Sequence, residues 1–227
     1  MQPFTVSEES KRLKNTYPPH ELLAEVASKL SKVERQGLLR LWISEGIPYA
    51  FKDCPMVYEA VREWLGKCLD VHPKMITLIG SARIGYSLAP PPEYGRSFNP
   101  DSDLDFSIVS HYLFERFEQD FLKWEDEFSK GLIHPRNPKE KGYWENNVRE
   151  VPNNIERGFI HGNRVPYMGR YPTAQLIGNT MDLLHKRLKV TVCAPQLKKE
   201  PSVRVFRDWS AFIRLREINL RRTLDLL

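Results

Sequence analysis

The segment from Ile76 to Val109 constrains the fold of this chain more than any other part of the sequence. An apolar run over Ile76–Ile79 predicts a strand that ends at Gly80-Ser81. A short helical pattern over Ala82–Leu88 follows, and a proline-rich loop then leads to a second apolar run over Leu104–Val109. We therefore predict a strand, a glycine turn, a short helix and a second strand in that order.

The second predicted strand begins with an Asp-x-Asp motif. Asp103 and Asp105 are two residues apart, so on a strand their side chains share one face while Leu104 and Phe106 pack on the other. Two adjacent carboxylates repel each other unless a cation lies between them. An EF-hand is excluded, because its invariant glycine would be Phe106 and its last ligand Tyr112. The motif predicts a Mg²⁺ or Mn²⁺ site completed by substrate phosphates.

The Gly80-Ser81 turn predicts a phosphate-binding site. It follows a strand and opens a helix, which presents backbone N–H groups and the positive end of a helix to an anion. Ser81 adds a hydroxyl donor. The G-x-x-x-x-G-K-[ST] pattern of a P-loop does not occur, so a Walker-type NTPase is not indicated.

Composition narrows the class of protein. The chain has 227 residues, of which 41% are hydrophobic and 28% charged, as expected for a globular protein of one or two domains. Its three cysteines form no C-x-x-C motif, and no apolar run approaches the length of a membrane helix. We therefore expect a cytoplasmic protein without a membrane partner. The net charge of +5 favours a polyanionic partner such as a nucleotide or RNA.

The chain is predicted to form one domain. Residues 1–19 are polar and predict a flexible N-terminal arm, and residues 20–227 predict a single domain with its core at about 55–195. A helical pattern begins at His20, continues to Trp42 and ends at Gly46 and Pro48. Asp53 is the predicted cap of a second helix, with Pro55 in its first turn.

The second half of the sequence predicts helices interrupted by short strands. Further helices are expected over His111–Lys130, from Thr173 onward, and over Arg207–Leu227. The acidic residues of the first of these, Asp120 and Glu125–Glu127, are interpreted as a solvated face. In the last helix, Trp209 and Leu227 are expected to face the core. Its arginines, including Arg216, lie largely outside the apolar stripe, which leaves solubility and phosphate contact as alternatives.

Strands are expected at three positions in this half. They are Phe159–Ile160, Lys189–Ala194 and Ser202–Phe206. Residues 131–172 are rich in glycine, proline and asparagine, and apart from the strand at Phe159–Ile160 they show no clear periodicity. We therefore predict an irregular segment there, and in a compact domain such a segment is either functional or wrongly assigned.

Together these motifs resemble the DNA polymerase beta-type nucleotidyltransferase superfamily. The residues that carry the resemblance are Gly80, Ser81, Arg83, Ser87, Asp103 and Asp105. The resemblance implies an α+β nucleotidyltransferase fold, in which a small mixed β-sheet is flanked by helices and extended by helical N- and C-terminal additions. Members of the superfamily act in RNA processing, antibiotic modification, bacterial defence and toxin–antitoxin systems.

By the same resemblance, Gly80 and Ser81 would hold a triphosphate, and Asp103 and Asp105 would be the catalytic, metal-binding carboxylates. Arg83 would contact a phosphate or form a structural salt bridge, and Ser87 would lie near the nucleotide. The implied reaction is Mg²⁺-dependent transfer of a nucleoside monophosphate from an NTP, with ATP expected, to an RNA, protein or small-molecule acceptor.

The third carboxylate of active members is not found in this sequence. The segment Lys189–Ala194 contains no acid, and the other candidates are Glu156 and His161, with Arg157 beside them. Loss of a general base typically costs about 10²–10⁴-fold in rate. The alternative is therefore a catalytically inactive nucleotidyltransferase-like protein that binds a nucleotide, RNA or a protein partner.

Overall fold

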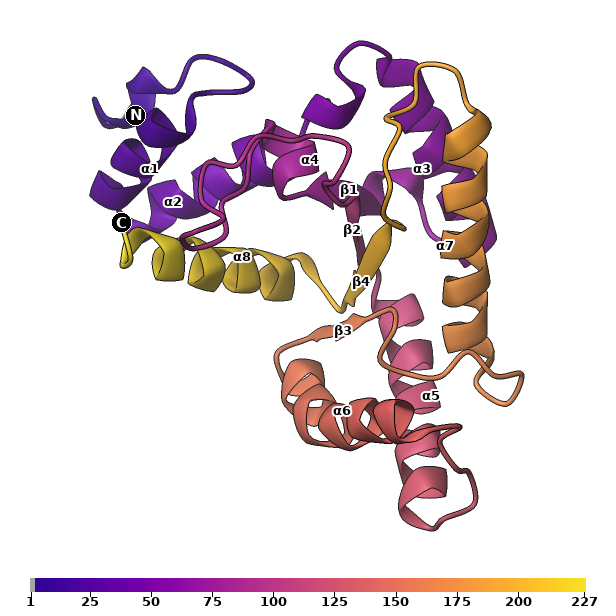
Figure 1. Cartoon of the computed structure of the whole chain (residues 1–227). Coiled ribbons are helices and arrows are strands. Elements are labelled where there is room, and N and C mark those ends of the chain that lie inside the picture. Colours follow the sequence, from indigo (N-terminus) through magenta and orange to yellow (C-terminus); the bar gives the residue numbers. More distant parts are fainter. Residues whose placement is uncertain (1–2) are drawn as a thin grey trace.

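The computed structural model describes residues 3–227, which form a four-stranded mixed sheet and eight α-helices (Figure 1). The predicted α+β class with a small mixed sheet flanked by helices is confirmed at this level. Residues 1–2 of the predicted N-terminal arm lie outside the described residues. No helix within residues 3–227 is both long and apolar enough to cross a membrane.

The sheet has the order β1-β2-β4-β3. β1 (Ile76–Ile79) is antiparallel to β2 (Asp105–Val109), which is parallel to β4 (Ser202–Phe206), and β3 (Phe159–His161) is antiparallel to β4. These four strands match the predicted ones within two residues.

The strand predicted at Lys189–Ala194 is wrong. α7 (Pro172–Val190) continues through its first residues, and the chain then turns. Apolar and polar residues alternate in KVTVCA as they do in many strands. Val190 and Val192 are both exposed, however, so these side chains do not pack against an apolar surface.

One face of the sheet holds the larger core. α3 (Pro55–Leu69), α5 (His111–Ser129) and α7 cover this face (Figure 1). Leu78 and Phe106 from the sheet pack there with the aromatic stripe of α5, in which Trp124 is fully buried. The N-cap of α3 is Cys54 rather than the predicted Asp53, and Cys54 makes no side-chain capping bond.

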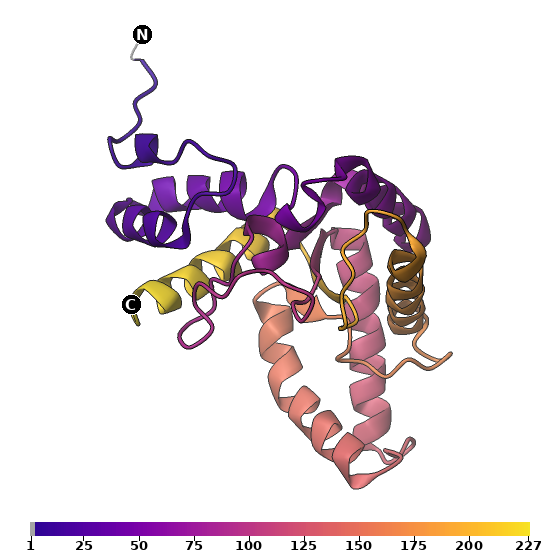
Figure 2. The same cartoon turned by 45° about the horizontal axis from the view of Figure 1, so that its top comes forward.

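The opposite face is covered by α8 (Trp209–Leu224) and by the N-terminal helices (Figures 1 and 2). Ile79, Val109 and Phe206 from the sheet pack there. Because side chains alternate along strands, Asp105 shares this face with Val109, so the Asp-x-Asp motif faces α8. The prediction that Trp209 and Leu227 face the core is wrong, because their exposed fractions are 41% and 60% respectively.

The helix predicted from His20 to Trp42 is divided into three parts. α1 (His20–Lys29) ends before an extended residue, Leu30, and α2 (Lys32–Leu38) continues into a π-helical segment over Leu39–Ser44. The break follows from a capping box, in which Ser31 accepts a hydrogen bond from the backbone of Glu34 and the Glu34 side chain accepts one in return.

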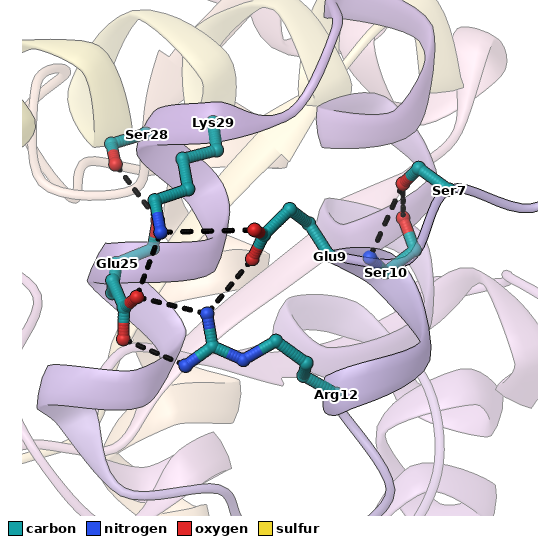
Figure 3. Close-up of polar contacts among 7 residues, drawn as sticks. All are labelled: Ser7, Glu9, Ser10, Arg12, Glu25, Ser28 and Lys29. Atoms are coloured by element: carbon teal, nitrogen blue, oxygen red, sulfur yellow. Dashed lines mark hydrogen bonds and ion pairs between the residues drawn. The ribbon is translucent and has the colours of Figure 1, made fainter.

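The predicted N-terminal arm contacts α1 through a network of ion pairs (Figure 3). Arg12 lies 2.8 Å from both Glu9 and Glu25, and Lys29 pairs with Glu25 at 2.8 Å. Each of these pairs is exposed, so each contributes little to stability. Their geometry nevertheless places the arm along α1.

The prediction of an irregular segment over residues 131–172 is wrong for its first half, which contains α6 (Pro138–Glu156). Asn137 caps this helix and Pro138 occupies its first turn. Trp144 and Val151 lie one heptad apart and are both buried, but the polar residues between them and Pro152 directly after them obscure the helical period. α5 and α6 meet where they are joined and diverge toward the sheet (Figure 2).

The acidic residues of α5 are not a uniformly solvated face. Asp120 is buried, and its Oδ2 accepts hydrogen bonds from the backbone N–H groups of Thr173 (2.6 Å) and Ala174 (2.9 Å). The carboxylate therefore satisfies free N–H groups at the start of α7. Glu127 accepts a hydrogen bond from the hydroxyl of Tyr171 at 2.5 Å, so it too joins α5 to α7.

Candidate functional site

The turn after β1 has a backbone conformation that is essentially restricted to glycine. Gly80 has φ 67° and ψ −150°, and it precedes α4 (Ser81–Ile84). A Cβ atom on Gly80 would lie 3.4 Å from Oδ2 of Asp105, so the turn and the carboxylate are neighbours. Gly85, with φ 94°, ends α4 after one turn, which is shorter than the predicted Ala82–Leu88. A single turn aligns few peptide dipoles, so any anion here is bound mainly by individual groups.

Both carboxylates of the Asp-x-Asp motif lie beside this turn. Asp105 is the first residue of β2 and pairs in register with Ile79, whereas Asp103 precedes the strand. Oδ1 of Asp105 accepts a hydrogen bond from the Ser202 hydroxyl at 2.5 Å, and Asp103 lies 3.2 Å from Nζ of Lys199. Both carboxylates therefore already have a partner within the chain.

These residues line a cavity of about 480 Å³ between α4, the start of β2 and α8. Figures 1 and 2 show the loop after α4 between α4 and α8. The polar residues of the lining are Gly80, Ser81, Ser87, Glu93, Arg96, Asp103, Asp105, Arg216, Asn219, Arg222 and Thr223. The hydroxyl of Thr223 donates a hydrogen bond of 2.7 Å to the carbonyl of Leu88, which joins the loop to α8.

Arg216 of α8 also lines this cavity; the sequence pattern left solubility and phosphate contact as alternatives for it. Its Nε and Nη2 atoms are buried and have no hydrogen-bond partner among residues 3–227. The guanidinium lies 6.0 Å and 5.8 Å from the ring centroids of Phe206 and Phe212. Burial, together with the charge of Arg204, lowers the pKa of Arg216 to about 9, while Asp105 acts in the opposite direction. Arg216 is therefore a protonated cation at neutral pH.

Arg204 lies on β4 on the same face as Asp105. In the parallel ladder Asp105 pairs with Ser202 and Ser107 with Arg204, so the Arg204 side chain is directed toward α8. Burial lowers the pKa of Arg204 to about 10, and the negative charge of Asp105 opposes this effect. The resemblance stated above implies an acid on a later strand beside the Asp-x-Asp motif, and on β4 this chain has an arginine.

The remaining predicted site residues have different surroundings. Ser87 lines the cavity, but Arg83 is buried outside its lining and donates to the carbonyl oxygens of Ile47 (2.9 Å) and Glu45. Glu156 is the last residue of α6 and Arg157 its C-cap, both outside the lining.

His161 lies behind the cavity, where its Nδ1 accepts a hydrogen bond from Nε of Arg204 at 3.4 Å. Arg204 in turn lies close enough to Asp105 to be influenced by its negative charge. His161 is therefore placed to position Arg204 rather than to contact a ligand.

The carboxylates fit one Mg²⁺ ion better than two. Within residues 3–227, no three His, Cys, Asp or Glu side chains are grouped as a set of metal ligands. Asp103 and Asp105 provide two hard oxygen donors, to which ligand phosphates would have to be added. The neighbouring guanidinium of Arg204 disfavours a second cation on the β4 side.

Comparisons of the chain with protein-family models, with curated proteins and with solved structures find no match. Any assignment of function to this chain therefore depends on the residues of the cavity, their charges and the order of the elements that carry them.

The half-buried imidazole of His161 gives the fold a specific dependence on pH. Burial, followed by the charges of Arg204 and Arg164, lowers the pKa of His161 to about 3, from 6.5 in an unfolded chain. Between these two pKa values the unfolded chain binds a proton that the folded chain does not, so stability is lost as the pH falls. We expect His161 to contribute a slope of up to about 1.4 kcal/mol per pH unit.

Urea unfolding of the wild type and of His161→Asn, measured between about pH 4 and pH 6, isolates this contribution. The free energy of unfolding of the variant should depend less steeply on pH. His134→Asn, at an exposed position, is the matched control and should follow the wild type. Identical pH slopes for the wild type and His161→Asn would contradict the prediction.

Proposed function

We propose that the chain binds a nucleoside triphosphate, with ATP as the expected ligand, in the cavity between α4, β2 and α8. The observation that carries this proposal is that Gly80, Asp105 and Arg216, from three separate elements, line one cavity. Its volume of about 480 Å³ suits a ligand of this size, because small-molecule sites usually measure about 300–1,000 Å³. The phosphates would lie between the Gly80-Ser81 turn and Arg216.

The order of the elements supports a nucleotidyltransferase-like fold. A strand, a glycine-serine turn and an antiparallel strand that begins with Asp-x-Asp are followed by a helix and later by a strand parallel to β2. This is the arrangement expected from the resemblance to the polymerase beta-type superfamily. The nucleotidyltransferase fold is part of the proposal, and fold alone does not specify activity.

We favour nucleotide binding without nucleotidyl transfer. The reason is β4, where Ser202 pairs in register with Asp105 and Arg204 follows on the same face, so neither of these two positions carries a carboxylate. An arginine remains protonated and cannot accept the proton of an attacking hydroxyl. The chain would then act through the bound nucleotide, or through an RNA or protein partner that recognises the bound state.

Mg²⁺-dependent transfer of a nucleoside monophosphate to an RNA, protein or small-molecule acceptor is the second candidate. It is favoured by Asp103 and Asp105, both of which line the cavity beside Gly80. A bound Mg²⁺ would neutralise phosphate charge and stabilise a leaving pyrophosphate. In this chain Asp103 and Asp105 would hold the ion and Ser81 would orient a phosphate.

The two candidates are separated by measuring binding and turnover on the same samples. Equilibrium dialysis with labelled ATP and Mg²⁺ measures binding, and pyrophosphate release with and without total RNA measures turnover. Asp101→Asn is a matched control for Asp103→Asn/Asp105→Asn, because Asp101 pairs with Lys198 at 2.8 Å and lies outside the cavity lining.

We expect the wild type and Asp101→Asn to bind ATP without releasing pyrophosphate. Pyrophosphate release that is lost in the double variant would instead favour transfer. If neither ATP nor another nucleoside triphosphate binds, the proposed function is wrong.

A further inference from the structure

We propose that Arg216 is the principal phosphate-binding residue of this cavity and that it allows a triphosphate to bind without a divalent cation. The inference rests on the proposed nucleotide binding and adds how the phosphate charge is neutralised. The superfamily resemblance implies metal ions in this role. In this chain a guanidinium from α8 reaches the same cavity as the two carboxylates.

Two nitrogen atoms of the Arg216 guanidinium lack a hydrogen-bond partner. Buried polar groups in folded proteins are nearly always hydrogen-bonded, and burying a charge without a partner is costly. Nε and Nη2 of Arg216 are both buried and have no hydrogen-bond partner among residues 3–227. Because Arg216 also lines the cavity, an anion bound there could accept from Nη1, the guanidinium nitrogen that is not among these buried atoms. Phosphate is the anion best matched to the planar donors of arginine.

The charges of Asp105, Arg204 and Arg216 beside the cavity do not cancel. Asp103 is paired with Lys199, and Asp105 accepts a hydrogen bond from Ser202 while it faces the charges of both Arg204 and Arg216. One carboxylate therefore stands against two half-buried arginines, of which Arg216 lines the cavity. The surplus positive charge at this wall of the cavity favours a polyanion.

The guanidinium of Arg216 is held in place before a ligand binds. It packs against the rings of Phe206 and Phe212, which belong to β4 and α8 and are both fully buried. A cation held against aromatic rings loses little further conformational freedom on binding. A preformed cation can replace part of the charge neutralisation that Mg²⁺ usually provides for phosphates.

The test compares ATP and tripolyphosphate binding in EDTA and in Mg²⁺ by isothermal titration calorimetry. The variants are Arg216→Gln and, as a matched control from the same helix, Arg214→Gln, whose side chain is exposed and outside the cavity lining. We expect the wild type and Arg214→Gln to bind both ligands in EDTA. Arg216→Gln should bind about 10- to 100-fold more weakly, as expected when hydrogen bonds to a charged group are lost.

Two further measurements keep the result interpretable if Arg216→Gln folds poorly. Arg216→Lys retains the charge but not the planar donors and should bind about 10-fold more weakly in EDTA. In thermal unfolding, ATP should raise the Tm of the wild type more than that of Arg216→Lys.

The two proposals can fail separately. Binding that requires Mg²⁺ and is unaffected by replacing Arg216 would overturn the inference and leave the proposed function intact. No binding of ATP, of another nucleoside triphosphate or of tripolyphosphate in either buffer would overturn both. Binding of tripolyphosphate alone in EDTA, lost in Arg216→Gln, would support Arg216 as the phosphate contact and contradict the nucleoside part of the proposed function.

Discussion

Replacing Arg83 by Met is expected to lower the free energy of unfolding by about 2–4 kcal/mol without changing the affinity for ATP of the molecules that remain folded. Arg83 is only 1% exposed, and its guanidinium donates to backbone carbonyl oxygens at the end of the π-helical segment, including those of Glu45 and Ile47. Methionine fills a similar volume but donates no hydrogen bond, so these oxygens lose their partner.

Urea unfolding measures the stability change, and calorimetry at a temperature where the variant is folded measures its ATP binding. Arg40→Met, at an exposed position in the same π-helical segment, is the control and should change stability by less than about 0.5 kcal/mol. A stable Arg83→Met protein that no longer binds ATP would contradict the structural role and restore the phosphate contact expected from the sequence.

Arg83 illustrates where sequence reasoning reaches its limit. Its position after Gly80-Ser81 predicts a short helix, and Arg83 does lie on α4. The direction of its side chain depends on the backbone carbonyl groups of Leu41, Glu45 and Ile47. These residues lie more than thirty positions earlier in the sequence, so no local pattern encodes the contact.

Local patterns located the four strands of the sheet, but they also predicted a strand at Lys189–Ala194 that does not form, and they were insufficient for what surrounds the sheet. Apolar runs bounded by glycine or proline predicted β1 and β2, and the alternation that places Asp105 opposite Phe106 follows from strand geometry alone. The helical period of α6 was obscured because its buried side, including Trp144 and Val151, is interrupted by polar residues.

The cavity residues that the sequence predicted as site residues all belong to one continuous segment, Ile76–Val109. Gly80, Ser81, Asp103 and Asp105 do line one cavity, but the wall opposite them comes from α8. On a helical projection, Arg216 lies next to the apolar stripe, where a solvated arginine is the ordinary interpretation. Only the packing of α8 across the sheet places it against Phe206 and toward Asp105.

Replacing Gly80 by Ala is expected to affect both stability and binding. At φ 67° and ψ −150° an alanine would be strained by about 1–3 kcal/mol, and its Cβ would lie 3.4 Å from Oδ2 of Asp105, on the side where the phosphates are proposed to approach. We expect a corresponding loss in the free energy of unfolding and ATP binding that is at least about 10-fold weaker.

Gly142→Ala is the matched control, because Gly142 lies within α6, is exposed, and has open space where a Cβ would be added. That substitution should leave ATP affinity unchanged and raise stability by about 0.5–1 kcal/mol, since alanine is the better helix former. If Gly80→Ala loses stability but keeps its ATP affinity, the turn is a structural feature and Arg216 alone would have to account for phosphate binding. If it keeps its stability, the strain assigned to this backbone conformation is wrong.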